Sequence, residues 1–172
     1  GQVSGTLVAA PGYVAVDGES FHRLEQKISG VSIRPSITGI YYSGTWNMDE
    51  VLQGRIQSFG VAVSLSGMPG ADFMSEGSGA LWTQFASAAL KNGKPMTSVM
   101  IANIFNRSVG NNAERGKMKV YAAPYVIFTD GTTLISDTEV AYSMYDVMKK
   151  ADTQAYEANK AALEAFYLTW QD

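Results

Sequence analysis

A strand–turn–strand signal between residues 119 and 143 limits the fold of this 172-residue chain more than any other feature. The dipeptide Asp130-Gly131 separates two β-prone runs, and glycine tolerates the positive φ that tight hairpin turns require. Both alternating faces of the first run are largely apolar, which is typical of a strand covered on both sides. Pro124 cannot donate a ladder hydrogen bond, so we expect a bulge or a locally unpaired position there. The segment therefore predicts a central strand of an antiparallel sheet.

Short β-prone segments separated by turn residues fill most of the chain before this hairpin. The predicted strands are residues 2–10, 12–18, 21–36, 39–46, 56–66 and 97–106. Gly30 indicates a bulge in the third of these strands, and Asn47 or Asp49 is placed to cap one helical turn. Residues 66–80 are rich in turn formers, and residues 81–90 fit a strand or a helix. Many short strands with glycine-rich turns favour a two-sheet β-sandwich.

The apolar period changes from two to that of a helix after residue 142. Ser143 and Asp146 have the spacing of a capping box at the start of a helix over residues 144–151. A second helix is predicted from an apolar stripe made of Tyr156, Leu163, Tyr167 and Trp170. We therefore expect a mainly β chain with a β-sandwich over residues 1–142 and C-terminal helices over residues 143–172, docked on the same domain.

Composition excludes several classes of partner. There are 13 Lys and Arg residues against 16 Asp and Glu residues, so the net charge of −3 gives no general attraction for nucleic acid or an anionic membrane. No apolar run approaches the roughly 20 residues that cross a bilayer. The chain has no cysteine, which removes disulfides, thiolate catalysis and cysteine-based zinc sites. We expect no nucleic-acid partner and no membrane insertion.

The residue types that carry catalysis do not form a recognisable set in the sequence. His22 is the single histidine and is expected to be a hydrogen-bonded or surface residue of a strand. Residues 110–118 are similar to a phosphate-binding loop but have the wrong glycine spacing. Asp137 and Glu139 lie two positions apart on a predicted strand, a spacing that any solvated strand face produces. We expect no catalytic residue, no cofactor, no metal and no enzymatic activity.

Aromatic residues are the remaining candidates for binding. Tyr41, Tyr42, Trp46 and Trp82 lie in or beside predicted loops. The C–H faces of pyranose rings pack on such side chains, so an exposed strip of them would form a glycan platform. Tyr41 and Tyr42 are adjacent on a strand and point to opposite faces, so at most one belongs to the core. The alternative is that most of these side chains fill the core of a small sandwich.

Residues 56–142 resemble a known type of module. The runs "IQSFGVAVS" and "KVYAAPYVIFTDGTTLISDTEVAYS" are similar to the later strands of fibronectin type III-like modules. The order "RPSITGIYYSGTW", "FGVAVSLSGMPGADF", "YAAPYVIFTDGT" is similar to modules of large secreted surface proteins of anaerobic gut bacteria.

This resemblance implies an immunoglobulin-like or fibronectin type III-like sandwich with an extracellular or cell-surface location. It supplies no catalytic residues. We expect a non-catalytic structural or protein-interaction module, whose partners are neighbouring modules or other surface proteins. The alternative is a carbohydrate-binding module that uses the four aromatic residues to bind polysaccharide.

Overall fold

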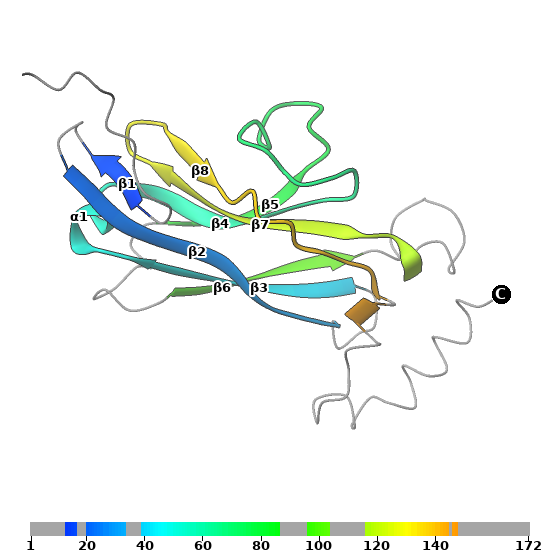
Figure 1. Cartoon of the computed structure of the whole chain (residues 1–172). Helices are drawn as coiled ribbons and strands as arrows, with labels where there is room; N and C mark the ends of the chain where they lie inside the picture. Colours follow the sequence, from blue (N-terminus) through cyan, green and yellow to red (C-terminus); the bar gives the residue numbers. More distant parts are fainter. Residues whose placement is uncertain are drawn as a thin grey trace, which may run out of the picture.

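Over its described residues the chain is mainly β and forms two antiparallel sheets with almost no helix (Figure 1). The computed structural model describes residues 13–16, 20–33, 39–86, 96–103, 116–144 and 146–147. The strand predicted over residues 2–10 lies outside this described part. Residues 81–86, which fitted a strand or a helix, form a strand.

The first sheet has four strands in the order β1-β2-β3-β6. They are β1 (Tyr13–Val16), β2 (Ser20–Ile33), β3 (Gly39–Met48) and β6 (Met96–Asn103). The register of β2 against β3 shifts between Ile28 and Gly30, which confirms the predicted bulge. A one-turn helix, α1 (Glu50–Gln53), follows β3, and Asp49 caps it by accepting a hydrogen bond from the N–H of Leu52.

The second sheet contains the predicted central strand. Its members are β5 (Leu81–Ala86), β4 (Ile56–Ser64), β7 (Val120–Phe128), β8 (Thr133–Ile135) and β9 (Ala141–Tyr142). β7 pairs with β4 along one side and with β8 and then β9 along the other, so the prediction of a central strand is confirmed. Pro124 lies where the pairing passes from β8 to β9, and its carbonyl accepts a hydrogen bond of 3.1 Å from Ser136. Pro124 stays in register with Val61 of β4, so it is locally unpaired only on the side of β8 and β9, and it is not a bulge.

The turn between β7 and β8 has the conformation that its sequence predicts. Gly131 has φ of 88°, and its N–H donates to the carbonyl of Phe128 at 2.9 Å. The carboxylate of Asp130 accepts a 2.8 Å hydrogen bond from the N–H of Thr132. These contacts close a short hairpin in which only glycine takes the left-handed conformation without strain.

One hydrophobic core lies between the two sheets. Trp46 of β3 meets Phe59 of β4 edge to face, with ring centroids 5.0 Å apart. The Tyr42 hydroxyl donates to the carbonyl of Val120 at 2.5 Å and accepts from the N–H of Tyr142 at 3.2 Å. Burial raises the pKa of this hydroxyl well above its usual value, so it stays protonated and able to donate. The Tyr42 hydroxyl therefore links the first sheet to two strands of the second.

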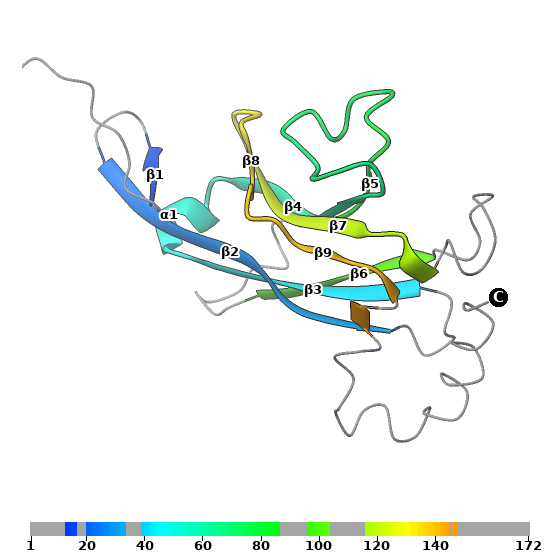
Figure 2. The ribbon, with the colours of Figure 1, turned by 45° about the vertical axis from the view of Figure 1, so that its right-hand side comes forward.

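The outer face of the five-stranded sheet is covered as well. Ala62, Tyr125 and Ile127 point away from the main core and form a second buried cluster with Phe73. Phe73 comes from the turn-rich segment between β4 and β5, which Figures 1 and 2 show on the side of this sheet away from the other sheet. A segment predicted only as a loop therefore supplies a core residue.

The structure does not support the helical appendage predicted over residues 143–172. The predicted capping box is present, because the N–H of Ser143 donates to Asp146 at 2.9 Å and the N–H of Asp146 donates to the Ser143 hydroxyl at 3.0 Å. Lys119 adds an exposed ion pair to Asp146 at 3.2 Å. Residues 148–172, where most of both helices was predicted, lie outside the described part of the chain.

Candidate functional site

The four aromatic residues predicted as a glycan platform do not form one strip. Tyr42 and Trp46 are 0% exposed and belong to the core, so neither can stack on a ligand. Tyr41 is half-buried on the opposite face of β3, and Trp82 lies on the other sheet. The prediction fails for Trp46 because β3 continues to Met48, which makes residue 46 an inward-facing strand position and not a loop residue.

Trp82 is the member of the predicted set with the largest exposed fraction. It lies opposite Ala62 in the register of β4 and β5 and is 39% exposed. Phe73 meets it at a ring-centroid distance of 5.6 Å and an interplanar angle of 83°. Phe73 in turn packs on Tyr125 at 4.5 Å, and burial raises the pKa of Tyr125 to about 12. The indole is therefore held at the edge of a packed aromatic cluster.

A small pocket of about 120 Å³ opens beside Phe73. Its wall is polar over much of its extent and is made by Ser64, Ser66, Gly67, Met68, Pro69, Gly70, Asp72, Phe73, Ser78 and Ala80. The hydroxyls of Ser64 and Ser66 lie 3.1 Å apart, and the Ser78 hydroxyl donates to the carbonyl of Phe73 at 2.6 Å. Sequence reasoning missed this pocket, and the lone Phe73 among glycine, serine and proline residues was its only local signal.

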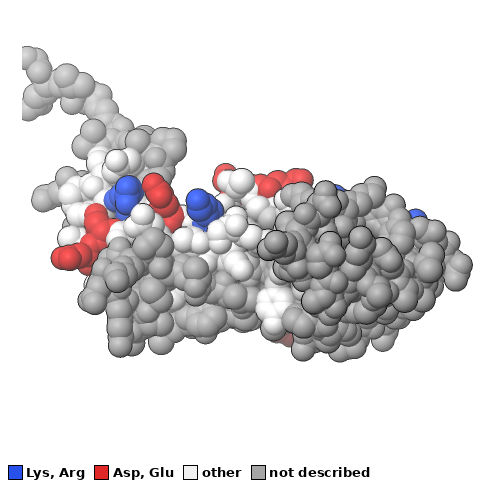
Figure 3. All heavy atoms as spheres, turned by 90° about the horizontal axis from the view of Figure 1, so that it is seen from below, with Lys and Arg blue, Asp and Glu red and all other residues white. Residues whose placement is uncertain are grey.

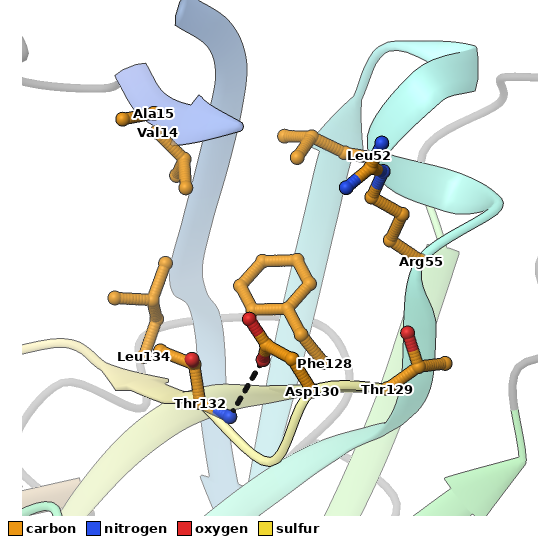
Figure 4. Close-up of a pocket in the computed structure, with 9 residues that line it drawn as sticks. All are labelled: Val14, Ala15, Leu52, Arg55, Phe128, Thr129, Asp130, Thr132 and Leu134. Carbon is orange, nitrogen blue, oxygen red and sulfur yellow. Dashed lines mark hydrogen bonds between the residues drawn. The ribbon is translucent and has the colours of Figure 1, made fainter. Parts of the chain in front are cut away.

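A second pocket of about 140 Å³ opens at one end of the two sheets (Figure 4). Its floor is the buried pair Leu52 and Phe128, and Val14 and Leu134 form apolar walls. Its polar lining residues are Arg55, Thr129, Asp130 and Thr132. Figure 4 shows Phe128 between Leu52 and Leu134, with the Asp130 carboxylate bound to the N–H of Thr132.

The polar lining of this end pocket carries charges of both signs. The hydrogen bond from Thr132 to the Asp130 carboxylate, helped by the positive charge of Arg55, holds the pKa of Asp130 below its usual value of 3.8. Asp130 is therefore ionised at neutral pH. No sequence motif could have indicated this pocket, since its residues come from β1, from α1 and the link to β4, from the end of β7, and from the turn into β8 and β8 itself.

His22 forms a hydrogen-bonded chain with two residues that sequence reasoning did not connect to it. Its Nδ1 lies 2.6 Å from Asp49, and its Nε2 lies 3.1 Å from the Ser20 hydroxyl. The expectation of a hydrogen-bonded strand histidine is confirmed. The order of the three groups is that of a serine nucleophile with its base, but acyl transfer also needs donors for an oxyanion, and the described contacts identify none. The contacts that are present hold β2 against the start of α1.

The pKa of Asp49 reflects the same contacts. Desolvation is the largest effect and opposes ionisation, but the favourable contacts, led by the hydrogen bonds from Leu52 and His22, together outweigh it. The pKa of Asp49 therefore lies below its usual value of 3.8. The helix cap and the His22 contact both favour the carboxylate form.

The described charges do not gather into a patch of one sign on the face seen from below. Figure 3 shows basic and acidic side chains close together over its described part. Arg23 and Glu25 form one exposed pair at 4.0 Å. Within the described residues, no His, Cys, Asp and Glu side chains group in threes as metal ligands. No helix in the same residues is long and apolar enough to cross a bilayer.

Comparisons with protein-family models and with curated proteins found no match. Among solved structures, the chain is similar to catalytically inactive OgpA from Akkermansia muciniphila, which was crystallised with an O-glycopeptide substrate. The TM-score is 0.36 and the identity 13%, over 69% of this chain and 30% of that one. This chain thus spans less than a third of that protein's length. A likeness this weak has no bearing on fold or function.

Proposed function

We propose that this chain is a non-catalytic extracellular module of a larger cell-surface or secreted protein, and that it serves as a structural or protein-interaction unit. The two facing sheets would then be an immunoglobulin-like or fibronectin type III-like sandwich. The similarity of the runs "RPSITGIYYSGTW", "FGVAVSLSGMPGADF" and "YAAPYVIFTDGT" to surface-protein modules supports the location. The end pocket lined by Leu52, Phe128, Val14 and Leu134 is the observation that carries the proposal.

The lining of this pocket is suited to binding an apolar side chain of another module. An apolar floor with a polar margin is the usual anatomy of a small protein-interaction pocket. The floor is an open end of the main core, because Leu52 and Phe128 belong to that core. An aliphatic side chain entering here would extend the core, while the Thr129 and Thr132 hydroxyls and the charges of Arg55 and Asp130 would meet the polar groups around it.

The position of the pocket suits modules that are linked in series. It lies at the Phe128 end of β7 and is bordered by β1, the first described strand. β9, the last described strand, pairs at the Val120 end of β7. The pocket and β9 therefore lie at opposite ends of β7, so a module bound at the pocket would leave the β9 end open to another partner.

The test compares the module alone with the same module inside a longer protein that includes its neighbours. Leu134→Gln places a polar group in the pocket wall, and Ile135→Gln is the matched control. Ile135 is the next residue of β8, is also half-buried and packs on the outer cluster instead. Contact with a neighbour should raise the unfolding temperature of the module, since binding to the native state stabilises it.

For each variant, the quantity compared is the unfolding temperature of the module in the longer protein minus that of the same variant as an isolated module. We expect Leu134→Gln to abolish this difference and Ile135→Gln to retain it. An increment that both variants retain would show that the contact lies elsewhere. Equal melting of the module alone and in the longer protein would refute the structural proposal.

Carbohydrate binding is the second candidate function, favoured by one observation. Trp82 keeps an exposed indole surface beside a pocket with hydroxyl and carboxylate groups. Three of the four residues first considered for a platform do not share this location, so this function depends on a site of different composition.

A further inference from the structure

We propose that Trp82 and the pocket beside Phe73 form a saccharide-binding site on the outer face of the five-stranded sheet. The indole of Trp82 stacks on the C–H face of a pyranose ring, and the hydroxyls and the Asp72 carboxylate of the pocket bind sugar hydroxyls. This inference rests on carbohydrate binding, the second candidate function, and is independent of the end pocket.

The aromatic half of the site is fixed before any ligand arrives. Phe73 is almost fully buried and is packed between Trp82 and Tyr125. Trp82 therefore has a packed neighbour on the protein side while 39% of the residue stays exposed. A side chain that is already ordered loses little conformational entropy on binding, which favours a weak ligand such as a sugar.

The polar half of the site lies on a segment with many internal hydrogen bonds. The N–H of Phe73 donates to Gly70 at 3.0 Å, and the N–H of Ser75 donates to the carbonyl of Asp72 at 2.8 Å. The Ser78 hydroxyl bridges the carbonyl of Phe73 and the N–H of Ala80. These bonds hold the backbone on both sides of Asp72, so the fold sets the position from which its exposed side chain extends.

The Asp72 carboxylate lies close to the backbone of Gly70. A Cβ added at Gly70 would lie 3.2 Å from Oδ1 of Asp72, which is closer than ordinary van der Waals contact. The carboxylate therefore rests against the glycine backbone on the pocket wall. An ionised carboxylate accepts up to four hydrogen bonds and suits a pair of neighbouring sugar hydroxyls.

The size of the pocket limits how the sugar enters. Its volume of about 120 Å³ is below the roughly 300–1,000 Å³ of pockets that enclose a whole drug-sized ligand. Only the edge of one ring can enter, while the face of that ring or of the next one lies on Trp82. The site would bind a soluble glycan weakly and leave most of it in solvent.

A saccharide fits this surface better than an apolar protein partner does. Leu81 is exposed to 43%, but it lies opposite Val63 in the register and so points to the other face of β5 from Trp82. Leu81 and Trp82 therefore do not form one continuous apolar patch. Protein interfaces favour such a patch. An exposed indole beside hydroxyls and a carboxylate matches the mixed surface of a pyranose.

The experiment is calorimetry of the module against soluble starch-type, plant cell-wall and mucin-type glycans. Trp82→Ala and Asp72→Asn are the test variants. Leu81→Ala is the matched control, because it removes an equally exposed apolar side chain from the neighbouring position of the same strand. Circular dichroism first establishes that each variant is folded.

We expect at least one glycan to bind, and both test variants to weaken that binding about tenfold or more. Leu81→Ala should bind like the parent, and the affinity for a neutral glycan should change little with salt. Binding that survives both test variants, or no heat with any glycan, would overturn the site. Neither outcome affects the melting comparison at the end pocket, so failure of this inference and failure of the structural proposal are distinguishable.

Discussion

Gly44 is the position in β3 where we expect one added methyl group to cost the most stability. A Cβ at this position would lie 2.5 Å from Cη2 and 2.9 Å from Cζ3 of Trp46, and 3.1 Å from Cγ2 of Val61. Trp46 is two residues away on the same face, so its indole lies across the bare glycine backbone. Val61 belongs to the facing sheet. The methyl group of Gly44→Ala would therefore press on both sheets at once.

The size of the effect follows from what has to move. The indole of Trp46 is fully buried and in edge-to-face contact with Phe59, so it cannot swing into solvent without losing that contact. Overpacking of this kind costs about 1–3 kcal/mol. Gly30→Ala is the matched control in the same sheet, because the nearest atom to its added Cβ is the Cβ of Ser43 at 3.9 Å. We expect the control to change stability by less than about 1 kcal/mol.

Urea unfolding followed by far-ultraviolet circular dichroism measures both variants, with the slope m checked for constancy. Trp46→Phe provides a second test, since the shorter ring leaves room for the methyl group at residue 44. Gly44→Ala should cost less in that background, giving a coupling free energy of about 1 kcal/mol. Equal costs in the two backgrounds, or a Gly44→Ala variant as stable as Gly30→Ala, would refute the packing argument.

Substitutions at three further positions test other parts of the fold. Tyr42→Phe removes the hydroxyl that hydrogen-bonds to two backbone groups of the second sheet, and it should lower the free energy of unfolding in urea by about 1–3 kcal/mol. An unchanged urea midpoint would show that these two hydrogen bonds do not contribute to stability. Gly131→Val should lower stability by more than about 1 kcal/mol because φ at this position is 88°. Gly131→Asn should lower stability less, since asparagine tolerates positive φ better than valine does. Equal losses in the two variants would contradict the argument from backbone strain. Because the folded pKa of Asp49 is depressed, its carboxylate contributes stability that is fully present above pH 3.8 and is lost as the pH falls through the folded pKa. Asp49→Asn should therefore flatten the stability profile below about pH 4 while keeping the helix cap, and a variant with the parent's acid profile would refute this.

The features that the sequence predicted well are decided by a few adjacent residues. The Asp130-Gly131 turn requires one residue with positive φ, and the cap at Asp49 requires one side-chain oxygen three positions before a free N–H. The bulge at Gly30 is equally local. Such features depend little on the rest of the fold, so the sequence is sufficient to place them.

The sequence contains a pattern that places Trp46 in the core, although Trp46 was predicted to lie beside a loop. Ile40, Tyr42, Trp46 and Met48 share one parity, and all four are buried in β3. Ending the predicted strand at residue 46 made the tryptophan look like a loop residue. One more alternation, to Met48, would have placed it on the core face with Tyr42.

The two pockets depend on contacts that no local pattern contains. Leu52 and Phe128 share one core and one pocket because Ile56, shortly after Leu52, pairs with Phe128, and this strand pairing is non-local. Phe73 reaches Tyr125 only because its segment folds back over the outer face of the sheet. A single sequence gives no means of deciding which distant residues become neighbours.

The pairing of β4 with β7 has a consequence for the rate of folding. Val61 pairs with Pro124, so the strands that form the middle of the second sheet close a loop that contains β5 and β6. The partners of the Tyr42 hydroxyl likewise lie 78 and 100 positions further along the chain. The entropy of closing such loops is lost before the contacts stabilise the chain, so we expect refolding in roughly milliseconds to seconds. Until β7 arrives, β4 has an unpaired edge that can pair with the same strand of another copy, and aggregation should therefore compete with refolding most strongly at high protein concentration.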